Sequence, residues 1–221
     1  PVFDNRGVVK SSRAEVGYSI ADLADDTAAL IDALGHESMH VTGISMGGMI
    51  AQELALRHPE KIRSLTLGCT YAGGEGSALS PPETFQRLSS GWQSGDRELA
   101  LRTGWEVNVS AGFAANEDAF TAFKKAALDL PVAVPVIMGQ LQAISQHDTS
   151  ARLGDIAAPT LVVHGTDDQM LPVGNAPMIA DRIPGSRLEI FDGVGHLFFV
   201  EEPERSAELI REHARAATPS S

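Results

Sequence analysis

The chain has 221 residues, of which 43% are hydrophobic and 21% are charged, and its formal net charge is −12 at pH 7. This length suits one domain with a sizeable hydrophobic core. The negative charge disfavours nucleic acid and an anionic membrane surface as partners, because both require clustered Lys and Arg. The single cysteine, Cys69, excludes an internal disulfide and suits a reducing compartment, so we expect a cytoplasmic protein.

The first part of the chain predicts a helix followed by a strand–helix–strand unit. Apolar residues at helical spacing predict a helix over 20–34, with Ser19 as its N-cap. A short apolar run predicts a buried strand over 39–44, followed by a helix over 46–58 and a second strand over 62–67. Short connections between such elements are typical of a parallel βαβ unit.

The middle of the chain changes in character after a linker rich in Gly, Ser and Pro. Only helical patterns follow, over 82–90, 96–107, 117–129 and 133–146. An insertion of this size is larger than an ordinary loop and is expected to form a lid. We therefore expect a core made of residues 1–75 and 151–221, with a helical cap over 76–150. Five residues of this segment are candidates for lining a pocket or for simple packing: Trp105, Phe113, Phe123, Met138 and Leu141.

Strands resume after the insertion. The sequence predicts strands over 159–164 and 187–191, a helix over 174–182 between them, and a closing amphipathic helix over 199–216. The whole pattern indicates an α/β sheet that an all-helical segment interrupts.

Gly43-Ile44-Ser45-Met46-Gly47 matches the G-x-S-x-G motif and lies between a predicted strand and a predicted helix, which is the context this motif needs. Gly43 and Gly47 are expected to remove side chains that would collide in the sharp turn, leaving Ser45 strained and exposed. The backbone N–H of Met46, at the start of the helix, is expected to donate to a developing oxyanion. We predict that Ser45 is a nucleophile.

A serine nucleophile needs a base and a carboxylate that orients this base. His196 lies in a glycine-rich loop after the last predicted strand and is the expected base, whereas His164 ends an apolar run and is interpreted as a packed strand-end residue. Asp167 and Asp168 both follow the third strand, and we favour Asp168 as the acid. Asp192 is a weaker candidate, because it is only four positions before the histidine.

The segments GISMGG, HGTDDQMLP and GVGHLFFVEEPE occur in this order and resemble the α/β-hydrolase fold family, in which Ser, Asp and His follow one another along the chain. The H-G-x-x-D-x-x-x-P pattern of that family places the acid on Asp168. The residues 3–7 resemble the family's D-x-R-G turn, and Asp25 and Asp26 match acidic positions of its next helix. Within the family, the chain is most similar to 3-oxoadipate enol-lactonases and aclacinomycin-type methylesterases.

Two features differ from the family pattern. The first three strands of the family, and the H-G turn that supplies a second oxyanion donor, have no counterpart in the sequence, so we expect a fragment or one piece of a two-piece protein. Without them the sheet would have an open edge, and the oxyanion would lose a donor worth ~3 kcal/mol. Val9 also stands where the family usually has glycine and is expected to strain or reshape its turn.

The resemblance implies a serine hydrolase that acts on carboxylic esters or lactones by two-step acyl transfer through Ser45, His196 and Asp168. It implies a small-molecule substrate and no cofactor or metal, and it leaves a homo-oligomer open. Three alternatives remain: C–C bond hydrolysis on the same triad, cofactor-free perhydrolysis, and a non-catalytic ligand-binding protein that retains the triad.

Overall fold

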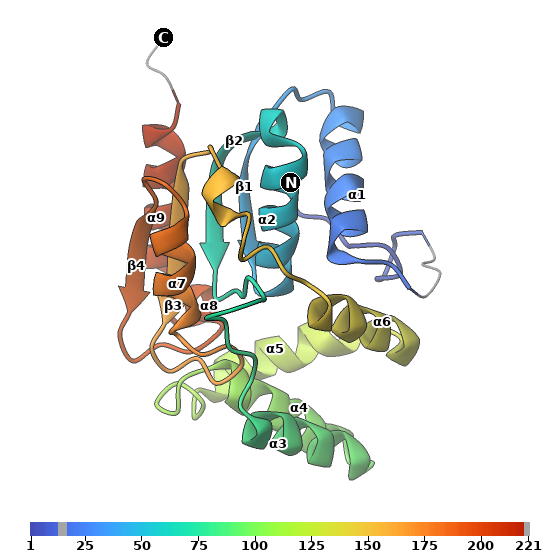
Figure 1. Ribbon diagram of the computed structural model, residues 1–221. Helices are drawn as coiled ribbons and strands as arrows, with labels where there is room; N and C mark the ends of the chain where they lie inside the picture. Colours follow the sequence, from blue (N-terminus) through green and yellow to red (C-terminus); the bar gives the residue numbers. More distant parts are fainter. Residues whose placement is uncertain (13–16, 219–221) are drawn as a thin grey trace.

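A computed structural model describes residues 1–12 and 17–218, and all four predicted strands form within this part of the chain. They make one parallel sheet in the order β1-β2-β3-β4 (Figure 1). Their bounds are β1 Met39–Ile44, β2 Ile62–Gly68, β3 Thr160–Gly165 and β4 Arg187–Phe191. All six residues of β3 are buried, which explains its continuous apolar run.

Helices cover both faces of the sheet. Successive side chains of a strand point to opposite faces, so the helices on each face pack against a different set of strand residues. On one face, α2 (Met46–Arg57) and α7 (Asn175–Arg182) pack on the strands, and α1 (Ile20–Ala33) packs on α2. Leu65, Leu67 and Val162 point into this cluster, whereas Leu161 and Val163 point to the opposite one, with α8 (Phe198–Glu201) and α9 (Pro203–Ala216). The sheet therefore carries two hydrophobic cores, one on each face.

The start of α1 agrees with the predicted N-cap. The Ser19 side chain accepts a hydrogen bond from the Asp22 backbone, and the Asp22 carboxylate accepts one from the Ser19 backbone, which completes a capping box. The two acidic residues in the middle of α1 also find partners. Arg6 binds Asp26 through two nitrogens, and Arg57 binds Asp25, so α1 is tied to the preceding turn and to α2.

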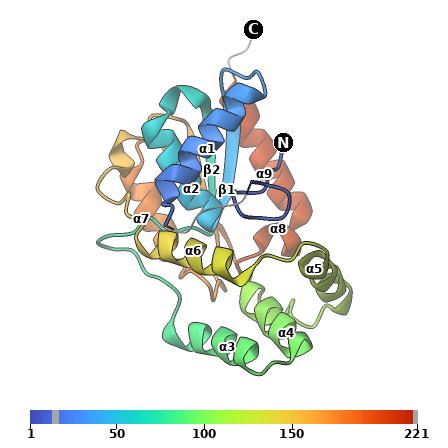
Figure 2. The same cartoon turned by 90° about the vertical axis from the view of Figure 1, so that its right-hand side faces the viewer.

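Four helices are inserted between β2 and β3: α3 Pro82–Gln93, α4 Arg97–Asn108, α5 Glu117–Asp129 and α6 Val134–Ser145. Figure 2 shows them below the strands and core helices, with α6 nearest to the core. Trp105 is fully buried and contacts the rings of Phe113, Phe120 and Phe123, so these aromatic residues hold the insertion together. The described residues also contain two short 3₁₀ turns: η1 Pro59–Lys61, before β2, and η2 Leu153–Asp155, before β3.

The predicted closing helix over 199–216 is wrong as a single element. It consists of α8 (Phe198–Glu201) and α9 (Pro203–Ala216), which are separated at Glu202. Pro203 disfavours a helical backbone in the residue before it, and Glu202 has φ −127° and ψ 62°.

Val9 has φ 41°, in the left-handed region that favours glycine and that a β-branched residue rarely adopts. The strain expected from valine at a position where the family has glycine is therefore present in the turn.

Within the described residues, no single helix is long and apolar enough to cross a membrane. In that part of the chain, α5 and α6 taken together reach that length and hydropathy, and they meet at 107°.

Candidate active site

Ser45 occupies the sharp turn between β1 and α2 and has φ 56° and ψ −123°, a strained conformation for a residue with a side chain. A Cβ at Gly43 would lie 2.1 Å from the Gly47 carbonyl oxygen, so this turn requires glycine at position 43. The same expectation for Gly47 is wrong, because a Cβ there would meet no described atom within 4 Å. The tight contact is instead at Gly48, where a Cβ would lie 2.5 Å from the Thr70 side chain.

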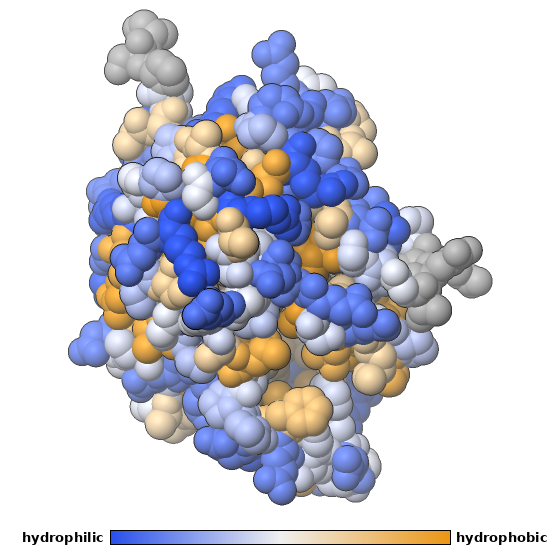
Figure 3. All heavy atoms as spheres, in the orientation of Figure 1, coloured by the Kyte–Doolittle hydropathy of each residue, from blue (hydrophilic) through white to orange (hydrophobic). Residues whose placement is uncertain are grey.

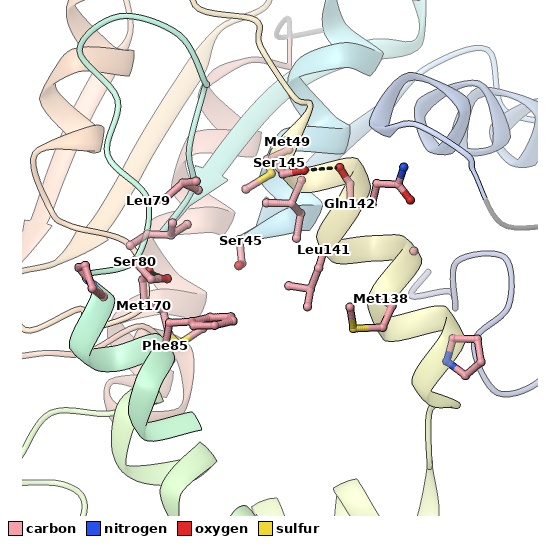
Figure 4. A pocket seen from close by; sticks show the side chains of 15 residues that line it. Ser45, Met49, Leu79, Ser80, Phe85, Met138, Leu141, Gln142, Ser145 and Met170 are labelled. Carbon is pink, nitrogen blue, oxygen red and sulfur yellow. Dashed lines mark hydrogen bonds between the residues drawn. The ribbon is translucent and has the colours of Figure 1, made fainter. Parts of the chain in front are cut away.

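The backbone of this turn is fixed by hydrogen bonds from the neighbouring strand. The Ser45 N–H donates to the Gly68 carbonyl over 2.9 Å, and the Thr70 hydroxyl donates to the Ser45 carbonyl over 2.7 Å. The Ser45 hydroxyl makes no capping hydrogen bond to α2 and points into an open pocket (Figure 4). Met46 is the first residue of α2, and its N–H belongs to the first turn, whose amides have no partner within the helix.

The structure brings Asp168 and His196 together. Both are buried, and His196 Nδ1 lies 2.8 Å from Asp168 Oδ2. Asp168 follows β3, and His196 follows β4, so neighbouring strands deliver the two side chains to the same edge of the sheet. Asp167, the alternative acid, is exposed and accepts a hydrogen bond from the Thr166 hydroxyl.

Asp168 accepts hydrogen bonds on both carboxylate oxygens. Its Oδ1 accepts the backbone N–H groups of Met170 and Leu171, each over 2.8 Å. Its Oδ2 faces two imidazoles, because His164 Nε2 also lies within 3.0 Å. Burial alone would raise the pKa of Asp168, but the hydrogen bonds from His164 and His196 reverse this effect and hold its pKa well below the usual value. The carboxylate is therefore ionised over the whole physiological range.

The contact of His164 with Asp168 was not predicted from the sequence. His164 is a fully buried strand-end residue, as expected, but its ring also contacts the proposed catalytic carboxylate. A histidine four positions before a candidate acid was the available signal, since a strand end followed by a turn can bring the two side chains together.

Ser45 follows β1 and therefore lies at the same edge of the parallel sheet as Asp168 and His196. Among the hydrogen bonds of residues 1–12 and 17–218, none connects the side chains of Ser45 and His196. The catalytic roles of Ser45, Asp168 and His196, and of the Met46 amide, stay predictions.

Cys69 lies close to the proposed acid and base. Its side chain is fully buried, and its backbone has φ 41°. Its sulfur lies within 4.8 Å of a carboxylate oxygen of Asp168 and of a ring nitrogen of His196. Burial, together with the negative charge of Asp168, raises the pKa of the Cys69 thiol well above its usual value. The thiol is therefore protonated, which is the unreactive state of a cysteine.

The loop that carries His196 is held against the end of α4. The Glu201 carboxylate accepts hydrogen bonds from the N–H of Gly195 over 2.8 Å and from the N–H and hydroxyl of Ser110. The N–H of Leu197 donates to the Asn108 carbonyl over 2.8 Å. The C-terminal end of α4, in the middle of the inserted segment, is thus fixed to the residues on either side of the proposed base.

A pocket of about 890 Å³ opens in front of Ser45. It lies between the insertion and the core, with α3 and residues 79–80 on one side and α6 on the other (Figure 4). Of the five residues that the sequence suggested for pocket lining or packing, Met138 and Leu141 line this pocket. Trp105, Phe113 and Phe123 pack within the insertion instead.

The comparisons with known proteins identify the family. A family model described as alpha/beta hydrolase fold matches residues 2–203. The chain belongs to the α/β-hydrolase fold family. The resemblance seen in the three sequence motifs is thereby confirmed, as is the predicted fold class.

Two relatives of this α/β-hydrolase chain are named as a depolymerase and as a methyl ester esterase. The poly(3-hydroxyalkanoate) depolymerase of Ectopseudomonas oleovorans is 31% identical over 210 residues, which span 94% of this chain and 72% of the relative. The pimeloyl-[acyl-carrier protein] methyl ester esterase of Aromatoleum aromaticum is 30% identical over 199 residues, or 85% of this chain and 78% of the relative.

Two solved structures, a lactone-degrading enzyme and an enol-lactonase, also superpose on this chain. Est816, described as an N-acyl homoserine lactone degrading enzyme, superposes with a TM-score of 0.75 at 32% identity and covers 95% of this chain and 80% of its own. The enol-lactonase from Burkholderia xenovorans LB400 reaches a TM-score of 0.81 over 96% of this chain and 79% of its own, but at 22% identity this likeness shows the fold alone.

Proposed function

We propose that this α/β-hydrolase is a serine hydrolase of carboxylic esters or lactones, with Ser45 as nucleophile, His196 as base and Asp168 as the acid that orients the base. The observation that carries this proposal is the 2.8 Å contact between His196 Nδ1 and Asp168 Oδ2, at the sheet edge where Ser45 is held in a strained turn. An ionised carboxylate can only accept, so Nδ1 donates and Nε2 is left free to take a proton.

In this mechanism, Ser45 Oγ attacks the substrate carbonyl while His196 Nε2 takes its proton. The Met46 N–H donates to the oxyanion, and the imidazolium then protonates the leaving alkoxide or enolate. Water, activated by the same histidine, cleaves the acyl-enzyme and returns the serine. We infer that the insertion acts as a cap, since α3 and α6 form two walls of the pocket that opens at Ser45.

The relatives support an ester or lactone as the bond that is cleaved. One is a methyl ester esterase, another is a poly(3-hydroxyalkanoate) depolymerase, and Est816 is described as an N-acyl homoserine lactone degrading enzyme, all at 30% identity or more. These bonds share one chemistry, because each places a carbonyl next to an alkoxide leaving group.

A fluorophosphonate probe tests the proposal directly. We expect the probe to label Ser45 in the full-length protein and to fail with Ser45→Ala. Ser80→Ala is the matched control and should keep the label, since Ser80 lines the same pocket but its hydroxyl donates to the Met170 carbonyl. A full-length protein that binds ligands but is never labelled would favour the non-catalytic alternative.

A further inference from the structure

The pocket beside Ser45 is lined mainly by apolar side chains. Met138, Leu141 and Ile144 come from α6, and Phe85 comes from α3 on the opposite side. None of the fifteen lining residues, all within the described part of the chain, carries a charge. A group that enters this pocket therefore meets hydrocarbon and thioether surfaces and a few neutral polar atoms.

Several of these side chains are exposed although they are large and apolar. The exposed fractions of Phe85, Met138 and Leu141 are 62%, 56% and 40%. Figure 3 shows apolar surface on both sides of a hollow at the level where the insertion meets the core. Apolar surface that gathers around a concave site is typical of a ligand-binding site, because contact with an apolar ligand removes it from water.

We propose that the substrate is an uncharged ester or lactone whose acyl group is an apolar chain that lies between α3 and α6. This inference rests on the proposed function of Ser45 and adds the substrate class. A carboxylate at the far end of the acyl chain would lose water without gaining a cationic partner among the lining residues, so substrates with such a group are selected against.

Matched substrates test this proposal. We expect kcat/KM for p-nitrophenyl esters to rise about two- to fourfold per methylene from butanoate to octanoate. The mono-p-nitrophenyl ester of octanedioic acid, which has the same acyl length and a terminal carboxylate, should be hydrolysed at least about 30-fold less efficiently than the octanoate. Equal kcat/KM for the two esters would overturn the substrate class, whereas turnover of neither would instead count against the proposed hydrolase function.

Charged variants then locate the selectivity. Met138→Lys should raise kcat/KM for the carboxylate ester about tenfold relative to the octanoate, because it places a cation in the apolar wall. Leu99→Lys is the matched control: Leu99 is exposed on α4 and does not line the pocket, so the ratio should stay as in the wild type. The assignment of the wall to α6 is overturned if the two variants change the ratio equally.

A second inference concerns His164 and rests on a separate observation. His164 Nε2 lies 3.0 Å from Asp168 Oδ2 and 2.9 Å from the Leu171 carbonyl oxygen, and both of these atoms are acceptors. The Nε2 atom must therefore carry a proton. His164 Nδ1 is buried and has no hydrogen-bond partner among the described residues, so the geometry points to the neutral tautomer with its proton on Nε2.

We infer that His164 is a positioning residue that acts through Asp168. The two backbone donors hold Oδ1, and the His164 ring, which is hydrogen-bonded to the Leu171 carbonyl, lies 3.0 Å from Oδ2 beside His196, so groups on three sides confine the carboxylate before the base is oriented. Because His164 does not line the pocket, its effect should fall on the chemical step rather than on substrate binding.

Two conservative variants test this role. In His164→Gln the amide nitrogen can occupy the position of Nε2, whereas in His164→Asn it is too short to do so. We expect His164→Gln to keep kcat within about threefold and His164→Asn to lose about 10- to 100-fold in kcat at unchanged KM. Equal losses in the two variants, or a wild-type kcat in His164→Asn, would overturn the inference.

Discussion

Replacing Asp168 with asparagine is the most informative perturbation of the proposed triad. The two backbone donors of Met170 and Leu171 both point at Oδ1, so the amide of asparagine is expected to place its carbonyl oxygen there. Its NH₂ group then faces His196 Nδ1, which lies 2.8 Å from Oδ2 in the wild type. An amide NH₂ group donates hydrogen bonds and does not accept them, so His196 Nδ1 must be the acceptor. His196 is therefore forced into the tautomer that carries its proton on Nε2.

A histidine with its proton on Nε2 cannot take the proton of Ser45. We therefore expect Asp168→Asn to lower kcat by up to about 10⁴, the magnitude associated with the wrong tautomer in a Ser-His-Asp triad. The cost in unfolding free energy should be only about 1–3 kcal/mol, because the backbone hydrogen bonds to Oδ1 survive.

The assay is the initial rate of ester hydrolysis, measured beside a urea unfolding curve for the same variant. Asp167→Asn is the matched control and should keep kcat within about twofold, because Asp167 is exposed and does not contact His196. The reasoning would be refuted by a folded Asp168→Asn protein within tenfold of wild-type activity, or by a larger loss in Asp167→Asn.

Three further predictions concern stability. Burial lowers the pKa of His147 to about 4, against about 6.5 in the unfolded chain, so the unfolded state binds the proton first as the pH falls. Between pH 6.5 and pH 4, about 3 kcal/mol of unfolding free energy should therefore be lost. In urea titrations at a series of pH values, His147→Gln should show a weaker dependence of the unfolding free energy on pH. Val9→Gly should raise the unfolding free energy by up to about 1 kcal/mol, because it relieves the positive φ, whereas Val9→Ala should give less; equal values would exclude backbone strain as the cause. Glu201→Gln should cost about 1–2 kcal/mol by weakening the contacts to Gly195 and Ser110, and an unchanged denaturation midpoint would contradict that role.

The secondary structure was predictable because each element has a local cause. The apolar run of β3 and the helical spacing of α1 are periodic signals, and Ser19 with Asp22 forms the capping box that starts α1. The break at Glu202 was equally local, since it depends on the proline that follows it, but the amphipathic pattern on both sides concealed it.

The finer geometry of the site depends on contacts between distant segments. The G-x-S-x-G motif selects Gly47, yet the position of Thr70 shows that its neighbour Gly48 is the one that must lack a side chain. The role of His164 depends in the same way on the turn that carries Asp168 back toward β3. Such relations are set by three-dimensional packing, and a single sequence carries no periodic signal for them.

The attachment of the insertion has a consequence for how new specificities can arise. Its α4 end is bound to the loop of His196 through Glu201, whereas the walls that face the pocket belong to α3 and α6. Substitutions on those two helices can reshape the pocket while the loop that carries the histidine keeps its anchor. Directed evolution toward other acyl groups should therefore gain most from libraries confined to α3 and α6, with the end of α4 left unchanged.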